Sequence, residues 1–147
     1  MKSRIYHTQS EEATIALGEA LAAKLPSKAL VLLIGNLGAG KTTLAKGIVK
    51  GLKAGEPNDV SSPTFTLIHE YGSSVYHVDL YRLDTAAQVA SLGLEEIFDR
   101  PAVVLIEWGE RFPELMPKER IEIRLRSTGE DSREIEVSTY PETASRE

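Results

Sequence analysis

The chain has 147 residues, a net charge of −5 at pH 7 and no cysteine. This length predicts a single domain over residues 1–147, the lack of cysteine excludes disulfides and thiolate metal sites, and the acidic charge argues against a broad nucleic-acid-binding surface. No apolar run approaches the roughly 20 residues of a membrane-spanning helix, and the first residues lack the apolar core of a signal peptide. We therefore expect a cytoplasmic protein that does not bind membranes.

The first elements are predicted to serve packing. Residues 3–6 are expected to form a short edge strand. Thr8 then opens a helix, with Glu11 three residues later in the pattern of a capping box. Alanine and leucine recur at helical spacing after it, and Pro26 and Ser27 end the helix.

A phosphate-binding loop is the most informative motif of the chain. Residues 29–34 are all apolar, as expected of a central parallel strand. The next nine residues, Gly35–Thr43, read Gly-Asn-Leu-Gly-Ala-Gly-Lys-Thr-Thr and fit the pattern G-x-x-x-x-G-K-[ST]. A helical pattern follows from Lys41, so the backbone N–H groups of residues 37–41 can surround a phosphate at a helix N-terminus. A glycine-rich turn without a ligand would need neither Lys41 nor Thr42.

The helix is expected over about residues 41–52, and a polar stretch with a central proline follows at residues 61–66. This stretch is predicted to be a loop between the helix and the next strand. In a P-loop fold, such a loop can fold over the γ-phosphate and the metal, although an ordinary turn explains the pattern equally well.

A β-hairpin is predicted over residues 67–80, with its turn at residues 72–74. Asp79 is a carboxylate near the end of the largely apolar second strand. His77 shares its face, because side chains alternate along a strand. For His77 we favour a hydrogen-bonded structural role.

A helix is expected to begin near Asp84 and Thr85, because Gln88 is placed for a capping box with Thr85. Gly93 is a natural stop for this helix.

The second continuous apolar strand, residues 101–107, ends on a carboxylate, Glu107. An acid at this place resembles a Walker-B element, which can hold Mg²⁺ directly or through water. A lone glutamate at a strand end is usually only solvated, but the P-loop favours a metal role. Trp108 follows and is either core or functional.

The last third alternates apolar and charged residues over 121–125 and 135–137, which predicts two half-exposed antiparallel strands. Together the elements predict an α/β fold: a P-loop NTPase-like, three-layer α/β/α domain whose mixed sheet has parallel core strands and antiparallel edge strands.

Three functions are compatible with these motifs. The chain lacks an Asn-Lys-x-Asp guanine-reading motif, so ATP is preferred over GTP. It also lacks the length for a substrate-binding lid domain, which weakens a small-molecule or protein kinase hypothesis without excluding it. The other two functions compatible with the motifs are an ATPase and a scaffold that binds a nucleotide without hydrolysing it.

Five blocks of the sequence resemble, in order and spacing, those of the YjeE/TsaE family of small bacterial P-loop ATPases. They are Gly35–Thr43, Ser61–Leu67 (SSPTFTL), His77–Leu83 (HVDLYRL), Gly93–Phe98 (GLEEIF) and Ile106–Glu110 (IEWGE). The family takes part in making threonylcarbamoyladenosine beside the anticodon of tRNA. The resemblance implies an ATP- and Mg²⁺-dependent ATPase, weak and monomeric when alone. Its partner would be a TsaB–TsaD heterodimer, whose transferase subunit TsaD carries out the modification and contacts the tRNA.

The resemblance also implies residue roles. Lys41 would contact the β- and γ-phosphates, Thr42 and Glu107 would hold Mg²⁺, and Asp79 would orient or activate the attacking water. No basic residue is assigned as an arginine finger, although Arg82 is a candidate. The expected nucleotide contacts are Asn36, Leu37, Gly38, Ala39, Gly40, Lys41, Thr42, Thr43, Thr64, Thr66 and Trp108.

Overall fold

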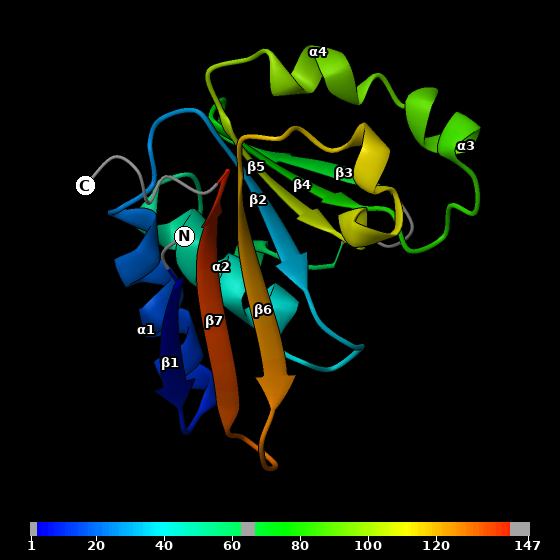
Figure 1. Ribbon diagram of the computed structural model, residues 1–147. Coiled ribbons are helices and arrows are strands. Elements are labelled where there is room, and N and C mark those ends of the chain that lie inside the picture. The colour runs from blue at the N-terminus through cyan, green and yellow to red at the C-terminus, as the bar shows by residue number, and fades with distance from the viewer. Residues whose placement is uncertain (1–2, 63–66, 142–147) are drawn as a thin grey trace.

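The computed structural model describes residues 3–62 and 67–141, and these residues form one seven-stranded sheet in the order β1-β7-β6-β2-β5-β4-β3 (Figure 1). The strands are β1 (Ser3–Thr8), β2 (Ala29–Ile34), β3 (Ile68–Tyr71), β4 (Val75–Asp79), β5 (Val103–Glu107), β6 (Arg120–Ser127) and β7 (Arg133–Tyr140). Strand β2 pairs in parallel with β5 and β6, and β5 pairs in parallel with β4. Strands β3, β7 and β1 add antiparallel pairs. The predicted mixed sheet is confirmed.

Helices cover both faces of the sheet. The long helices α1 (Glu11–Ala22) and α2 (Lys41–Gly51) pack together on one face, against a core that includes Val31, Leu33 and Leu105. The other face carries α3 (Ala86–Ala90), α4 (Leu94–Phe98) and the 3₁₀ turns η2 (Gly109–Arg111) and η3 (Pro113–Leu115), and its core includes Leu32, Val104 and Ile106. A further 3₁₀ turn, η1 (Pro57–Asp59), follows α2. Figure 1 shows α3 and α4 well apart from α1 and α2. No helix in the described ranges is long and apolar enough to cross a membrane.

The first helix begins and ends differently from the prediction. Its cap is Ser10, whose hydroxyl accepts the backbone N–H three residues on, at 3.0 Å. Thr8 instead ends β1, and its hydroxyl hydrogen-bonds to that of Thr14 at 2.7 Å. The prediction for Thr8 was wrong because pairing of β1 with β7 takes this residue into the sheet. The helix stops at Ala22, before Pro26 is reached.

The second half of the chain confirms one cap and corrects another. Thr85 and Gln88 form the predicted capping box at the start of α3. Gly93, predicted as a stop, has a φ of 74° and is the residue from which α4 begins. Helix α4 was not predicted from the sequence, and its Leu94 and Ile97 are buried against the sheet.

The C-terminal hairpin lies deeper in the sheet than its half-exposed pattern suggested. Strand β6 is an interior strand between β2 and β7, and Ile123 and Leu125 on it are buried. The two sheet edges are β1, as predicted from residues 3–6, and β3. The hairpin therefore brings the start of β7 to the end of the sheet where β2 runs into the P-loop.

Candidate functional site

The loop Gly35–Thr43 connects the carboxyl end of β2 to the first turn of α2. Gly38 and Gly40 have φ values of 80° and 106°, a region that glycine enters without steric cost. Between them Ala39 is buried, and its N–H donates to the carbonyl of Asn36 at 3.0 Å. The loop thus curls back on itself and leaves the N-terminus of α2 facing a hollow.

This hollow has a volume of about 310 Å³, within the range of small-molecule sites. It lies where β2, β4 and β5 end, the position at which open α/β sheets bind ligands. Its walls come from the P-loop, the ends of β4 and β5 and the start of β7. The lining residues are Leu37, Gly38, Gly40, Lys41, Thr42, Thr43, Ser62, Asp79, Tyr81, Glu107, Trp108 and Arg133.

Lys41 is the buried cation of the site, with 5% of its surface exposed. Its Nζ donates to the carbonyl of Gly35 at 2.7 Å and lies 3.9 Å from the ring centroid of Trp108. Burial lowers the pKa of Lys41, and the negative charges of Glu107, Glu110 and Asp79 act in the opposite direction, in that order. A phosphate entering the pocket would compensate the unfavourable burial of this ammonium group.

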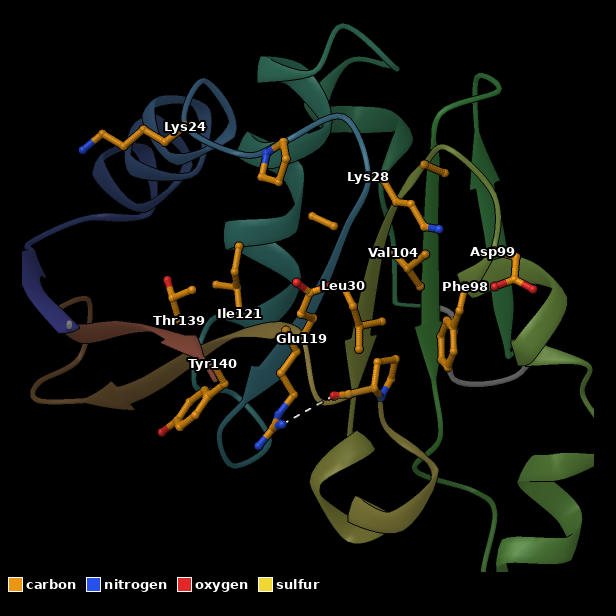
Figure 2. Close-up of a pocket in the computed structure, with 15 residues that line it drawn as sticks. Lys24, Lys28, Leu30, Phe98, Asp99, Val104, Glu119, Ile121, Thr139 and Tyr140 are labelled. Carbon is orange, nitrogen blue, oxygen red and sulfur yellow. Dashed lines mark hydrogen bonds between the residues drawn. The ribbon is translucent and has the colours of Figure 1, made fainter. Parts of the chain in front are cut away.

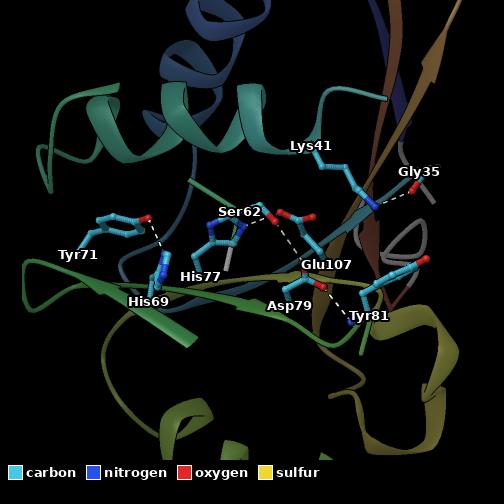
Figure 3. A network of polar contacts seen from close by, with 9 residues as sticks. All are labelled: Gly35, Lys41, Ser62, His69, Tyr71, His77, Asp79, Tyr81 and Glu107. Atoms are coloured by element: carbon cyan, nitrogen blue, oxygen red, sulfur yellow. Dashed lines mark hydrogen bonds and ion pairs between the residues drawn. The ribbon is translucent and has the colours of Figure 1, made fainter. Parts of the chain in front are cut away.

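Asp79 and Glu107 stand directly opposite each other in the parallel register of β4 and β5, and both are buried. Oδ1 of Asp79 accepts the N–H of Tyr81 at 2.8 Å, and its Oδ2 accepts the hydroxyl of Ser62 at 3.4 Å (Figure 3). Oε2 of Glu107 lies 2.7 Å from Nε2 of His77. The pairing of two parallel strands therefore places the two predicted acids together, next to Lys41.

Trp108 forms the wall of the pocket beside Lys41. Its φ of 68° is unfavourable for a bulky residue, and such strain is usually retained at functional sites. The ring packs against that of Tyr81, with 5.2 Å between centroids. The strained turn directly after Glu107 is what brings the indole over the lysine.

Arg133 is a pocket residue that the sequence analysis missed. It is the first residue of β7, and its Nη2 donates to the carbonyl of Gly38 at 3.3 Å while Nη1 donates to that of Ser132 at 2.8 Å. Arg82, the arginine considered from the sequence, is exposed after β4 and is not among the lining residues. Only the pairing of β6 with β2 brings Arg133 to the P-loop, and no local motif marks it.

The remaining predicted contacts fall into three groups. Thr42 and Thr43 line the pocket, whereas Asn36, which is exposed, and Ala39, which is buried, do not line it. Thr64 and Thr66 lie outside the described residues. Among residues 3–62 and 67–141 no cluster of three histidine or acidic side chains could hold a metal by itself. Thr42 with Glu107 fits Mg²⁺, because this ion usually takes few protein ligands and completes its shell with phosphate oxygens and water.

A second hollow, of about 670 Å³, lies at the opposite end of the sheet (Figure 2). Its floor includes Leu30, Val104 and Ile121, which stand at the amino ends of β2, β5 and β6. Lys28 and Asp99 are charged residues at its rim. It is larger than the P-loop pocket but contains none of the predicted site residues, and the amino ends of parallel strands are not where this class of fold binds nucleotides.

Comparison with known proteins agrees with this geometry. Residues 8–135 match the family model described as "Threonylcarbamoyl adenosine biosynthesis protein TsaE". This chain is 41% identical to the protein from Bacillus subtilis, and 43% identical to the protein from Nostoc, that are named tRNA threonylcarbamoyladenosine biosynthesis protein TsaE. These matches cover 92% and 88% of this chain and 85% and 82% of the relatives. The crystal structure of YdiB from Bacillus subtilis superposes with a TM-score of 0.76 at 34% identity, covering 95% of this chain and 87% of that one. The fold is P-loop NTPase-like, which implies nucleotide binding, and the chain belongs to the TsaE family.

Proposed function

We propose that this protein binds ATP with Mg²⁺ and hydrolyses it as an accessory protein of tRNA threonylcarbamoyladenosine biosynthesis. The observation that carries the ATPase proposal is the convergence of Lys41, Asp79 and Glu107 on one pocket at the P-loop. The names of the Bacillus and Nostoc relatives support the place in tRNA modification.

The described side chains suggest a division of roles. Lys41, which is buried beside acidic side chains, would neutralise charge on the β- and γ-phosphates. The Thr42 hydroxyl and Glu107 would hold Mg²⁺. When bound there, Mg²⁺ would supply positive charge that stabilises the negative charge of the phosphates. Asp79 would orient the attacking water, because the N–H of Tyr81 and the hydroxyl of Ser62 hold its carboxylate in one orientation.

The surface around the pocket supports a protein partner. Leu37 at the tip of the P-loop is 69% exposed, and Tyr81 at the other wall is 43% exposed. Large apolar side chains beside a nucleotide site are suited to contact with another protein. We propose that a TsaB–TsaD heterodimer is this partner, that ATP hydrolysis supports its turnover, and that tRNA contacts the partner. The net charge of −5 agrees with this division.

The test is ATP hydrolysis by the protein alone and with TsaB–TsaD from the same organism. Partners that neither bind nor change the rate would refute the accessory role. Lys41→Ala should abolish hydrolysis, because charge neutralisation is most of the catalysis available to a P-loop site. Lys50→Ala on the same helix is the matched control. Its ammonium makes a half-exposed ion pair with Glu19 at 3.6 Å, which contributes little.

Two further measurements separate the kinase and scaffold hypotheses from the ATPase. A kinase would transfer labelled γ-phosphate to a hydroxyl compound, whereas an ATPase releases free phosphate. A non-hydrolysing scaffold would support complex assembly and tRNA modification equally well with Asp79→Ala. In cells, depletion of this protein should lower the threonylcarbamoyladenosine content of tRNA.

A further inference from the structure

His77 is a fully buried polar residue whose partner is an acid of the proposed metal site. Its side chain has no exposed surface, and its Nε2 lies 2.7 Å from Oε2 of Glu107. Figure 3 shows the ring beside the Glu107 carboxylate, under helix α2. On β4 it stands two residues before Asp79 and therefore shares the face that Asp79 presents to the P-loop.

The proposed role of Glu107 assigns the direction of this hydrogen bond. As a metal ligand, Glu107 would be an ionised carboxylate, which only accepts hydrogen bonds, so the N–H of Nε2 on His77 is assigned as the donor to Oε2. The other ring nitrogen, Nδ1, is buried and has no hydrogen-bond partner among the described residues.

Packing alone does not explain a histidine at this position. The neighbours of His77 on the same face of β4 and β5 are Val75, Val103 and its register partner Leu105, all buried and apolar. An aliphatic side chain would continue this core without burying an unpaired polar nitrogen, which costs free energy. The contact with Glu107 is therefore the feature that distinguishes His77 from its apolar neighbours.

We propose that His77 is a positioning residue for the metal-binding carboxylate, an inference that rests on the proposed function. By holding Oε2, it restricts the torsions of the Glu107 side chain and leaves Oε1 as the oxygen that meets Mg²⁺ together with the Thr42 hydroxyl. Side chains that orient a metal ligand typically change metal affinity when they are replaced. Because His77 itself is not a lining residue of the pocket, binding of the nucleotide without metal does not depend on it.

Two amide substitutions test the contact. The amide nitrogen of glutamine reaches about as far as the Nε2 of histidine, whereas that of asparagine reaches only as far as Nδ1. His77→Gln should therefore keep a donor to Glu107, and His77→Asn should lose it. Calorimetry with a non-hydrolysable ATP analogue, in EDTA and in Mg²⁺, measures the metal gain, which is the factor by which Mg²⁺ increases the affinity for the analogue. We expect His77→Asn to reduce this gain about 10- to 100-fold, His77→Gln to retain most of it, and affinity in EDTA to stay unchanged in both.

Matched controls separate positioning from loss of fold. His69 is the cross-strand neighbour of His77 on β3 and contacts Tyr71, at 3.2 Å, so His69→Asn should leave the metal gain unchanged. Glu107→Ala should lose the gain, and adding His77→Asn to it should cause no further loss. If His77→Asn does not fold, as judged by circular dichroism, His77→Leu provides the same loss of a donor with an apolar side chain.

The possible outcomes distinguish this inference from the proposed function. A folded His77→Asn or His77→Leu variant with the full metal gain, beside a Glu107→Ala variant that has lost it, would overturn the role of His77 alone. A full metal gain in Glu107→Ala would overturn both the metal role of Glu107 and this inference. Absence of hydrolysis with the partners, beside the expected calorimetry, would refute the ATPase proposal and leave the positioning role standing.

Discussion

Replacing Gly47 with alanine tests how the P-loop helix is held in place. A Cβ atom built at Gly47 of α2 would lie 2.0 Å from the carbonyl oxygen of Ile15 and 3.0 Å from the N–H nitrogen of Glu19, both on α1. Gly18 and Gly51 are also tight, although less so than Gly47, with built Cβ atoms 2.5 Å from Leu44 O and 2.7 Å from the Ala22 Cβ. The two helices therefore touch through their backbones, and no side-chain rotation can relieve the clash.

The size of the effect follows from that distance. Helix α1 would have to move about 1.3 Å for the oxygen to reach an ordinary C···O contact of about 3.3 Å. Overpacking that shifts the backbone destabilises a fold by up to about 3 kcal/mol. The higher helix propensity of alanine relative to glycine offsets about 1 kcal/mol of this loss. We expect Gly47→Ala to lose about 2 kcal/mol of unfolding free energy, which for a chain of this size lowers the melting temperature by about 4–8 °C.

Urea denaturation and thermal melting measure this loss, and Gly55→Ala is the matched control. A Cβ at Gly55 would meet its nearest atoms, on Val49 and Asp59, at 3.4 and 3.5 Å, so alanine fits there. Because alanine also reduces the entropy of the unfolded chain, that variant should be as stable as the parent or slightly more stable. Equal stability of Gly47→Ala and the parent would refute the backbone contact between α1 and α2.

Three further predictions concern the site itself. Arg133→Ala should weaken binding of an ATP analogue about tenfold or more by calorimetry, because the contact of Arg133 with Gly38 and its charge at the pocket are lost. Arg126→Ala is the control and should leave binding unchanged, because Arg126 forms only an exposed ion pair with Glu134. Nucleotide should change the fluorescence of Trp108, the only tryptophan of the chain, since Lys41 would exchange its contact with the indole for phosphate; an unchanged spectrum at saturation would contradict this. Burial lowers the pKa of Lys41, while a bound phosphate favours its charged form. The affinity for the ATP analogue should therefore fall as the pH rises through that lowered pKa, below the usual 10.5. An affinity that stays constant up to pH 10.5 would refute this reasoning.

The motifs predicted which P-loop residues and strand-end acids meet at one pocket, because each motif depends on local sequence. The glycines of the P-loop and the acids at two strand ends have positions that the strand period and the loop pattern define without knowledge of the fold. Arg133 and the helix contact at Gly47 could not be predicted in this way. Both depend on which elements become neighbours, and the pairing of β6 with β2 and the packing of α1 on α2 are set by long-range burial. Thr8 failed for the same reason, since a paired strand overrides a local capping pattern.

The chemistry of the site depends on the same register that builds the core. Asp79 and Glu107 share one face of β4 and β5 with Val75, Val103 and Leu105, and these three apolar residues are buried in the core under α2. A slip of β5 by one residue would turn its apolar set over and move Glu107 to the far face of the sheet. The paired register of β4 and β5 thus sets the positions of both the carboxylates and these core side chains. Changes in this part of the core should therefore alter metal-dependent binding even where they leave every residue of the pocket intact.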